Sequence, residues 1–137
     1  MVNNLKITYI QYMIAPITET KEYSIVINNS YIKLIDQRSD QVVELNEIDE
    51  MIADVEKHRK SEKIPLIIVT GFGTMLTNEA RERLTHLAKS KTYKIAIIIH
   101  DFTQRIMGNF VIHLLNNRRS LQLFTNETDA KKWLLDI

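Results

Sequence analysis

Two apolar segments of strand length constrain the fold of this 137-residue chain more than any other feature. They run from Ile64 to Val69 and from Ile95 to Ile99, and isoleucine is the commonest residue in both. Strands that are covered on both faces, typically parallel ones, have such continuous apolar stretches, whereas half-exposed strands alternate between apolar and polar residues. A helical pattern separates the two segments. We therefore predict a strand–helix–strand unit with parallel pairing and a right-handed crossover.

Four further segments carry apolar residues at helical spacing, and each follows a residue that can cap a helix N-terminus. The four caps are Asn46, Thr77, Thr103 and Asn126. The stripes that follow them are Ile48, Ile52 and Val55; Ala80, Leu84, Leu87 and Ala88; Ile106, Phe110 and Leu114; and Ala130, Trp133, Leu134 and Ile137. Helices and strands are therefore expected to alternate through the second part of the chain.

An antiparallel hairpin is predicted in the first third of the chain. Residues alternate in character over Tyr23–Ile27 and Tyr31–Ile35, and the turn-forming cluster Asn28-Asn29-Ser30 lies between them. Further short strands are expected at Ile7–Ile14, Val42–Leu45 and Leu121–Phe124. This order predicts an α/β fold, with a mixed β-sheet in which an N-terminal antiparallel hairpin is followed by βαβα units.

The composition limits both the partners and the chemistry of the chain. With 18 Lys and Arg against 17 Asp and Glu, the net charge of +1 gives no electrostatic reason to expect nucleic acid or an anionic membrane as the main partner. The absence of cysteine excludes disulfides, thiolate metal sites and cysteine nucleophiles. No apolar run approaches the ~20 residues of a membrane span, and no signal pattern opens the chain. We expect one cytoplasmic domain over residues 1–137, without an integral membrane segment.

A candidate site is expected where the parallel strands end, because open α/β sheets bind ligands beyond the carboxyl ends of their strands. The residues concerned follow the two apolar strands or belong to the start of the next helix. They are Thr70, Gly71, Gly73, Thr74, Thr77, His100, Asp101, Arg105 and Asn109. The alternative interpretation is that these are loop and capping residues, which every strand–helix junction needs.

No motif for catalysis, metal binding or cofactor binding completes this set. Gly71-Phe72-Gly73-Thr74 lacks the Gly-Lys-Ser/Thr ending of a phosphate-binding loop. The four histidines form no i, i+4 pair with an acidic partner, and no Gly-x-Ser-x-Gly segment is present. Arg105 opposes the dipole at the start of its predicted helix, which favours a partner such as Asp101 or an anionic ligand, unless this face is simply solvated. We expect that the chain is not an enzyme and that it binds no metal and no cofactor.

Specific motifs occupy the second half of the chain. They are Asn78-Glu79-Ala80-Arg81, the strand Lys94 to Ile99, Arg105-Ile106-Met107-Gly108-Asn109-Phe110, and Leu123-Phe124-Thr125-Asn126-Glu127 leading to Ala130 and Trp133-Leu134. Together they resemble a group of small, largely uncharacterised bacterial proteins described as STAS/SEC14-like, or SpoIIAA-like. The resemblance covers roughly Val42 to the C-terminus and implies a single STAS/SEC14-like domain.

The resemblance implies a non-catalytic regulatory or protein-interaction module. Its partner surface would extend over 70–81 and 101–109. Members that act as anti-sigma-factor antagonists carry a phosphorylated serine in an Asp-Ser-Ser-Gly segment at the second helix. The present chain has Thr74-Met75-Leu76-Thr77-Asn78 there. Thr74 and Thr77 are therefore the candidate phosphorylation sites, with plain helix capping as the alternative for Thr77. A homodimer is also expected, because a mixed sheet leaves an edge to be covered or paired.

The alternative function is a small-molecule or lipid-binding SEC14-like domain. Such a domain requires an apolar pocket of ~300 Å³ or more. Four side chains near the predicted strand ends are candidates to line it: Phe72, Met75, Phe102 and Phe110.

Overall fold

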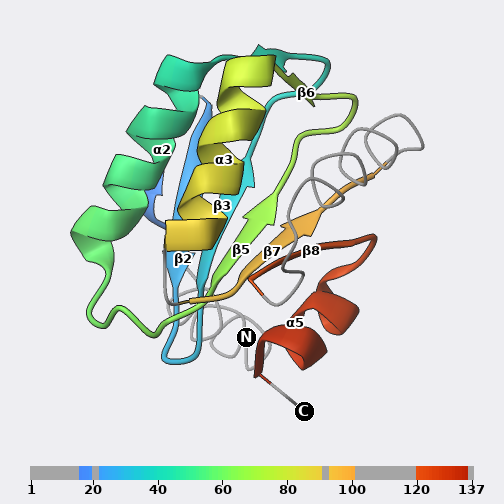
Figure 1. The fold of residues 1–137 in the computed structure, drawn as a ribbon. Coiled ribbons are helices and arrows are strands. Elements are labelled where there is room, and N and C mark those ends of the chain that lie inside the picture. The colour runs from blue at the N-terminus through green and yellow to red at the C-terminus, as the bar shows by residue number, and fades with distance from the viewer. Residues whose placement is uncertain (1–15, 20–21, 91–92, 101–119, 136–137) are drawn as a thin grey trace, which may run out of the picture.

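A six-stranded mixed sheet forms the centre of the molecule (Figure 1). The computed structural model describes residues 16–19, 22–90, 93–100 and 120–135. The strands lie in the order β1-β2-β3-β5-β7-β8. Their bounds are β1 (Pro16–Glu19), β2 (Tyr23–Ile27), β3 (Ile32–Asp36), β5 (Leu66–Val69), β7 (Ile95–Ile98) and β8 (Leu121–Phe124). The first three strands pair antiparallel and the other pairs are parallel, which confirms the predicted fold class.

The two apolar segments lie side by side in this sheet. Leu66 pairs with Ile95, and Val69 pairs with Ile98, in parallel register. Leu66 and Ile95 point to one face and Ile67 and Ala96 to the other, and all four are 0% exposed. The strand pair is therefore covered on both faces, as its composition predicts. The helix between the two strands, α3 (Asn78–Ser90), belongs to the connection from β5 to β7.

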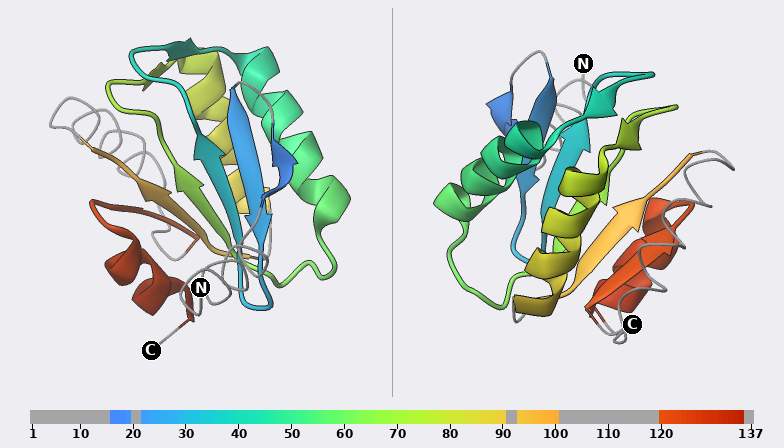
Figure 2. Two further views of the ribbon diagram at one scale, coloured as in Figure 1. Left: turned by 180° about the vertical axis from the view of Figure 1, so that it is seen from behind. Right: turned by 45° about the horizontal axis from the view of Figure 1, so that its top comes forward.

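Helices cover both faces of the sheet (Figures 1 and 2). α2 (Leu45–His58) and α3 pack over one face, and α5 (Glu127–Leu135) packs over the other face beside β7 and β8. Successive residues of a strand point to opposite faces, so Leu66 joins the core under α2 and α3 whereas Ile67 joins the core under α5. This two-sided burial explains why β5 reads as a continuous apolar run.

The expected strand Val42–Leu45 is wrong at its end. β4 covers only Val42–Val43, and α2 already begins at Leu45, with Glu44 rather than Asn46 as its N-cap. The Glu44 N–H donates to Glu47 Oε1 at 3.2 Å, so a carboxylate in the first turn satisfies the cap. β4 pairs in parallel with β6 (Met75–Leu76) outside the main sheet. Two-residue strands carry no periodic pattern, so β6 could not be predicted.

Two predicted helix caps are confirmed. Thr77 Oγ1 accepts a hydrogen bond from the Ala80 N–H at 3.2 Å, and Asn126 Oδ1 accepts one from the Asp129 N–H at 2.8 Å. Each bond satisfies one of the N–H groups that a helix start leaves without an intrahelical partner. The caps place α3 directly after the loop that follows β5, and α5 directly after β8.

Two expected elements lie outside the described residues: the strand over Ile7–Ile14 and the helix after Thr103. The strand β1, immediately after the first of these, was not predicted. Across the described ranges, no helix has the length and apolar character that crossing a membrane requires.

An ion pair joins the start of α5 to the sheet and makes the stability of the fold depend on pH. Lys33 Nζ lies 2.7 Å from Glu127 Oε1, and Lys131 Nζ lies 3.3 Å from Glu127 Oε2. Partial burial by itself raises the pKa of Glu127, but hydrogen bonds and charge from the two lysines outweigh it and lower the pKa below its ordinary value of 4.5. The stabilisation is therefore complete above that value and is lost as the pH falls through the folded-state pKa.

We expect Glu127→Gln to lower the free energy of unfolding by about 0.5 kcal/mol at neutral pH, since these groups are partly exposed. Near pH 2 the difference should vanish, because the carboxyl is then protonated in both states. Urea unfolding at the two pH values measures this. Glu79→Gln removes the first-turn carboxylate of α3 and controls for the helix dipole. A loss for Glu127→Gln that does not change with pH would contradict the prediction.

Candidate functional site

Two loops that lie side by side close the carboxyl edge of the parallel strands. The Asp40 N–H donates to the Phe72 carbonyl oxygen at 2.8 Å, and the Met75 N–H donates to the Gln41 carbonyl oxygen at 2.9 Å. The pairing of β4 with β6 continues this ladder. We call residues 37–43 and 70–77 the carboxyl rim. Backbone bonds between its two halves hold it as one unit on top of the sheet.

Both glycines of the predicted site are needed where the two halves of the carboxyl rim meet. A Cβ on Gly71 would lie 1.9 Å from the Arg38 carbonyl oxygen. Gly73 has a φ of +73°, and a Cβ there would lie 2.1 Å from Asp40 Oδ1. The close approach of the loops therefore accounts for the Gly-x-Gly spacing without a bound phosphate.

An aromatic ring projects from the carboxyl rim beside a histidine. Phe72 is 62% exposed, and its ring stacks on that of His100, with centroids 5.3 Å apart and planes 16° apart. The His100 Nε2–H donates to the Thr70 carbonyl oxygen at 2.6 Å, since only a donor can bond a carbonyl. Thr70 Oγ1 in turn donates to the Ile98 carbonyl oxygen at 2.8 Å. Thr70 and His100, both predicted site residues, are thus brought together at the ends of β5 and β7.

The two candidate phosphorylation sites differ in their surroundings. Thr74 is 6% exposed and lies in a turn in which its N–H donates to the Gly71 carbonyl oxygen at 3.1 Å. A kinase would reach this hydroxyl only if the carboxyl rim opened. Thr77 is half-buried and caps α3, as described above. Phosphorylation of either threonine remains a prediction.

Arg38, which the sequence analysis did not single out, fastens the carboxyl rim to α2. Its Nη1 lies 2.7 Å from Glu47 Oε2, and its Nε lies 3.2 Å from Asp36 Oδ1. Burial lowers the pKa of the guanidinium, but the hydrogen bonds to Glu47 and Asp36 outweigh burial and raise it. The sequence does place Asp36 and Arg38 two residues apart in a turn after a predicted strand. No sequence pattern, however, indicates that Glu47 in the next helix contacts Arg38.

The remaining predicted site residues, Asp101, Arg105 and Asn109, lie outside the described residues. The same holds for Phe102 and Phe110, two of the four aromatic or sulfur-containing side chains expected to line a pocket. Beneath the carboxyl rim, the core contains a cavity of only about 50 Å³, between the sheet and the helices α2 and α3. Ligand pockets are typically 300 Å³ or larger.

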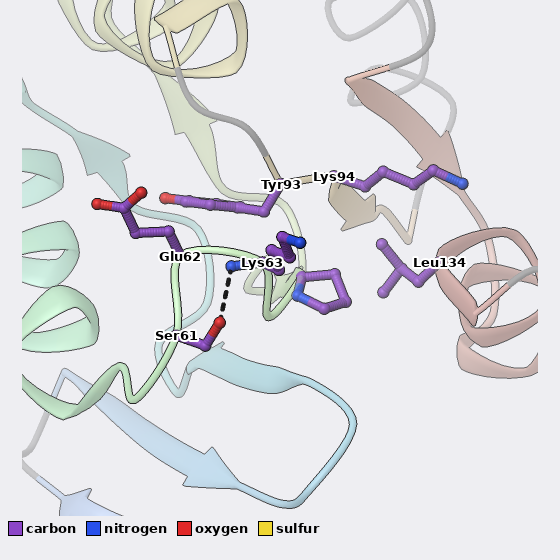
Figure 3. A pocket seen from close by; sticks show the side chains of 7 residues that line it. Ser61, Glu62, Lys63, Tyr93, Lys94 and Leu134 are labelled. Atoms are coloured by element: carbon purple, nitrogen blue, oxygen red, sulfur yellow. Dashed lines mark hydrogen bonds between the residues drawn. The ribbon is translucent and has the colours of Figure 1, made fainter.

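A larger hollow, of about 680 Å³, lies at the opposite edge of the sheet, where β5 and β7 begin (Figure 3). The picture shows Tyr93 and Lys94 along one side, Ser61 on another, and Leu134 projecting toward it from α5. Glu62, Lys63 and Pro65 complete the lining. Sequence reasoning missed this hollow because it searched the carboxyl ends of the strands, and residues 61–65 read as an ordinary loop.

The chemistry available in the described residues is limited. Nowhere in residues 16–19, 22–90, 93–100 and 120–135 do three or more His, Cys, Asp or Glu side chains gather as metal ligands. His100 lies beside the carboxyl rim, where its ring stacks on Phe72 and its Nε2–H donates to the Thr70 carbonyl oxygen. The arrangement offers a shaped, partly apolar surface.

A family model of known proteins matches the chain over residues 25–137, from β2 to the end. The model is described as a domain of unknown function, DUF7793. The chain belongs to the DUF7793 family. None of the curated proteins compared with this DUF7793 domain matches it.

A solved structure resembles the DUF7793 domain in fold. It is an uncharacterised protein of the DUF3478 family, with a SpoIIAA-like fold, from Shewanella loihica PV-4. The two chains share 17% identity with a TM-score of 0.55, over 85% of this chain and 97% of the other. At this identity the similarity concerns the fold alone. It confirms the SpoIIAA-like resemblance that the motifs of the second half indicate.

Proposed function

We propose that this DUF7793 domain is a non-catalytic regulatory module that docks a protein partner on its carboxyl rim. The observation that carries the proposal is the position of the exposed large apolar side chains. In the described part of the chain these are Val42 and Phe72, each 62% exposed. They lie on the two halves of the same rim, although they are far apart in sequence. Exposed apolar side chains that gather on one surface are typical of interaction sites.

The rigidity of the carboxyl rim supports a docking role. A partner loses less affinity to conformational ordering when the surface it binds is already held in place. Phe72 is flanked by two constrained glycines, its carbonyl accepts the Asp40 N–H, and its ring rests on His100. The small volume beneath the rim also favours surface contact over enclosure of a substrate.

The proposal predicts that Phe72→Ser abolishes partner binding and leaves the fold intact. Aromatic anchors commonly contribute 2 kcal/mol or more to an interface, so an affinity loss of about 30-fold or greater is expected. The test is affinity purification of the tagged chain from its native cells with quantitative mass spectrometry. Binding of each enriched protein is then reconstituted from purified components. Circular dichroism melting checks that the variant remains folded.

His86→Ser is the matched control, because it removes an exposed ring from the outer side of α3. A genuine partner binds the wild type and the His86→Ser variant with equal affinity and does not bind the Phe72→Ser variant. Light scattering of the purified chain distinguishes a second copy from a different protein as the partner. If Phe72→Ser retains every interaction of the wild type, the docking proposal fails.

A further inference from the structure

We propose that the hollow at the amino ends of β5 and β7 binds a small organic anion with an apolar body and one carboxylate or phosphate group. The inference goes beyond docking and does not depend on it, because the hollow lies at the other edge of the sheet from the carboxyl rim. Its volume of about 680 Å³ lies within the range of pockets that hold small organic ligands.

The apolar walls of the hollow come from Pro65, Tyr93 and Leu134. Tyr93 is held in place by two contacts. The Arg59 guanidinium carbon lies 3.7 Å from the centre of its ring, and its hydroxyl donates to Glu56 Oε1 at 2.7 Å. A wall fixed in this way is formed before a ligand arrives, which reduces the entropic cost of binding.

The charges around the hollow favour an anion. Its lining contains two lysines, Lys63 and Lys94, against one carboxylate, Glu62. Lys94 Nζ donates to the Trp133 carbonyl oxygen at 3.0 Å and lies 5.0 Å from the centre of the Trp133 ring. Lys63 is exposed and, within the described part of the chain, forms no ion pair. Its ammonium is therefore the group best placed to meet a ligand's anionic end.

The neighbouring indole provides a direct readout. Trp133 is the only tryptophan of the chain, it adjoins Leu134 in α5, and Lys94 lies over its ring. We expect octanoate and octyl phosphate to change the Trp133 fluorescence saturably. Two probes of the same chain length, neutral 1-octanol and cationic octylamine, should bind at least about ten-fold more weakly, because they lack the charge that Lys63 recognises.

Variants separate the specific contact from general attraction. Lys63→Glu should weaken octanoate binding by about ten-fold or more. Lys60→Glu makes the same charge change at an exposed position of the same loop that does not line the hollow, and should stay within about two-fold of the wild type. Ser61→Phe places a ring in the hollow and should also abolish binding. Circular dichroism melting of each variant confirms that it is folded.

Three results would overturn the proposal: no saturable change with octanoate or octyl phosphate at millimolar concentration, equal affinity for octylamine, or equal effects of Lys63→Glu and Lys60→Glu. Loss of octanoate binding in Phe72→Ser would overturn the independence of the two sites. Failure of Phe72→Ser to affect a protein partner would leave the anion site intact, so the two proposals fail separately.

Discussion

Gly71→Ala is expected to lower the free energy of unfolding by about 3 kcal/mol, the upper end of the usual cost of forcing extra atoms into a packed site. The added methyl would lie 1.9 Å from the Arg38 carbonyl oxygen and 2.7 Å from Thr74 Oγ1. The first of these atoms is backbone, and Arg38 is anchored through its own N–H and side chain to Asp36 and through its side chain to Glu47. The loops of the carboxyl rim must therefore separate, which urea unfolding would detect.

Gly73→Ala is the graded comparison for this effect. Its φ of +73° penalises a side chain by about 1–2 kcal/mol, but the atom its Cβ would meet is the end of the Asp40 side chain, which can rotate away. Gly73→Asn should recover part of that loss, because asparagine tolerates left-handed backbone. If Gly71→Ala unfolds at the same urea concentration as the wild type, the two loops are not packed as described.

The apolar segments made the centre of the fold predictable. Ile64–Val69 and Ile95–Ile99 lack the alternation of a half-exposed strand, so burial on both faces and parallel pairing followed from composition alone. The caps Thr77 and Asn126 were predictable for a similar reason, since each precedes an apolar stripe that begins three or four residues later. Local chemistry and burial pointed to the same structure at these positions.

The details that the sequence concealed depend on contacts between distant segments. β4 and β6 are two residues each and exist because Val42 lies against Met75, a pairing with no local signature. The start of α2 was misplaced for a related reason: Asn46 is the better capping residue by type, yet the Glu44–Glu47 bond moves the start to Leu45. Tertiary and side-chain contacts overrode propensity in both cases.

The candidate site was half predictable. Thr70 and His100 do meet at the carboxyl edge, as strand topology requires, and Gly71 and Gly73 lie in the loop that follows Thr70. The exposure of Phe72 and the contact of Arg38 with Glu47 in α2 are set by the folded arrangement of the rim and had no signature in the sequence. The hollow at the other edge combines segments around residues 61–65, 93–94 and 134, and only a folded chain brings them together.

Arg59→Ala is expected to lower the free energy of unfolding by about 3 kcal/mol, because the buried Arg59 side chain joins α2 to the loop that leads to β5. Its side chain is 4% exposed, its Nε lies 3.2 Å from Glu56 Oε2, and its Nη1 donates to the Ile64 carbonyl oxygen. It also covers the Tyr93 ring. Removing one partner of a buried pair typically costs 3–5 kcal/mol, and we expect the lower end because Glu56 is 32% exposed.

Arg83→Ala removes an exposed arginine and serves as the control. Its pair with Asp49 joins α3 to α2 at 3.4 Å, but the two side chains are 43% and 46% exposed, so a loss below about 1 kcal/mol is expected. Arg59→Lys keeps the charge but lacks the planar fork that bonds Glu56 and Ile64 while stacking on Tyr93, and should fall between the two alanine variants. Urea unfolding of the three variants ranks them directly. Equal losses of unfolding free energy for Arg59→Ala and Arg83→Ala would mean that burial adds nothing to the Arg59 contacts. The inference that Arg59 fixes Tyr93 as a wall of the hollow would then be contradicted.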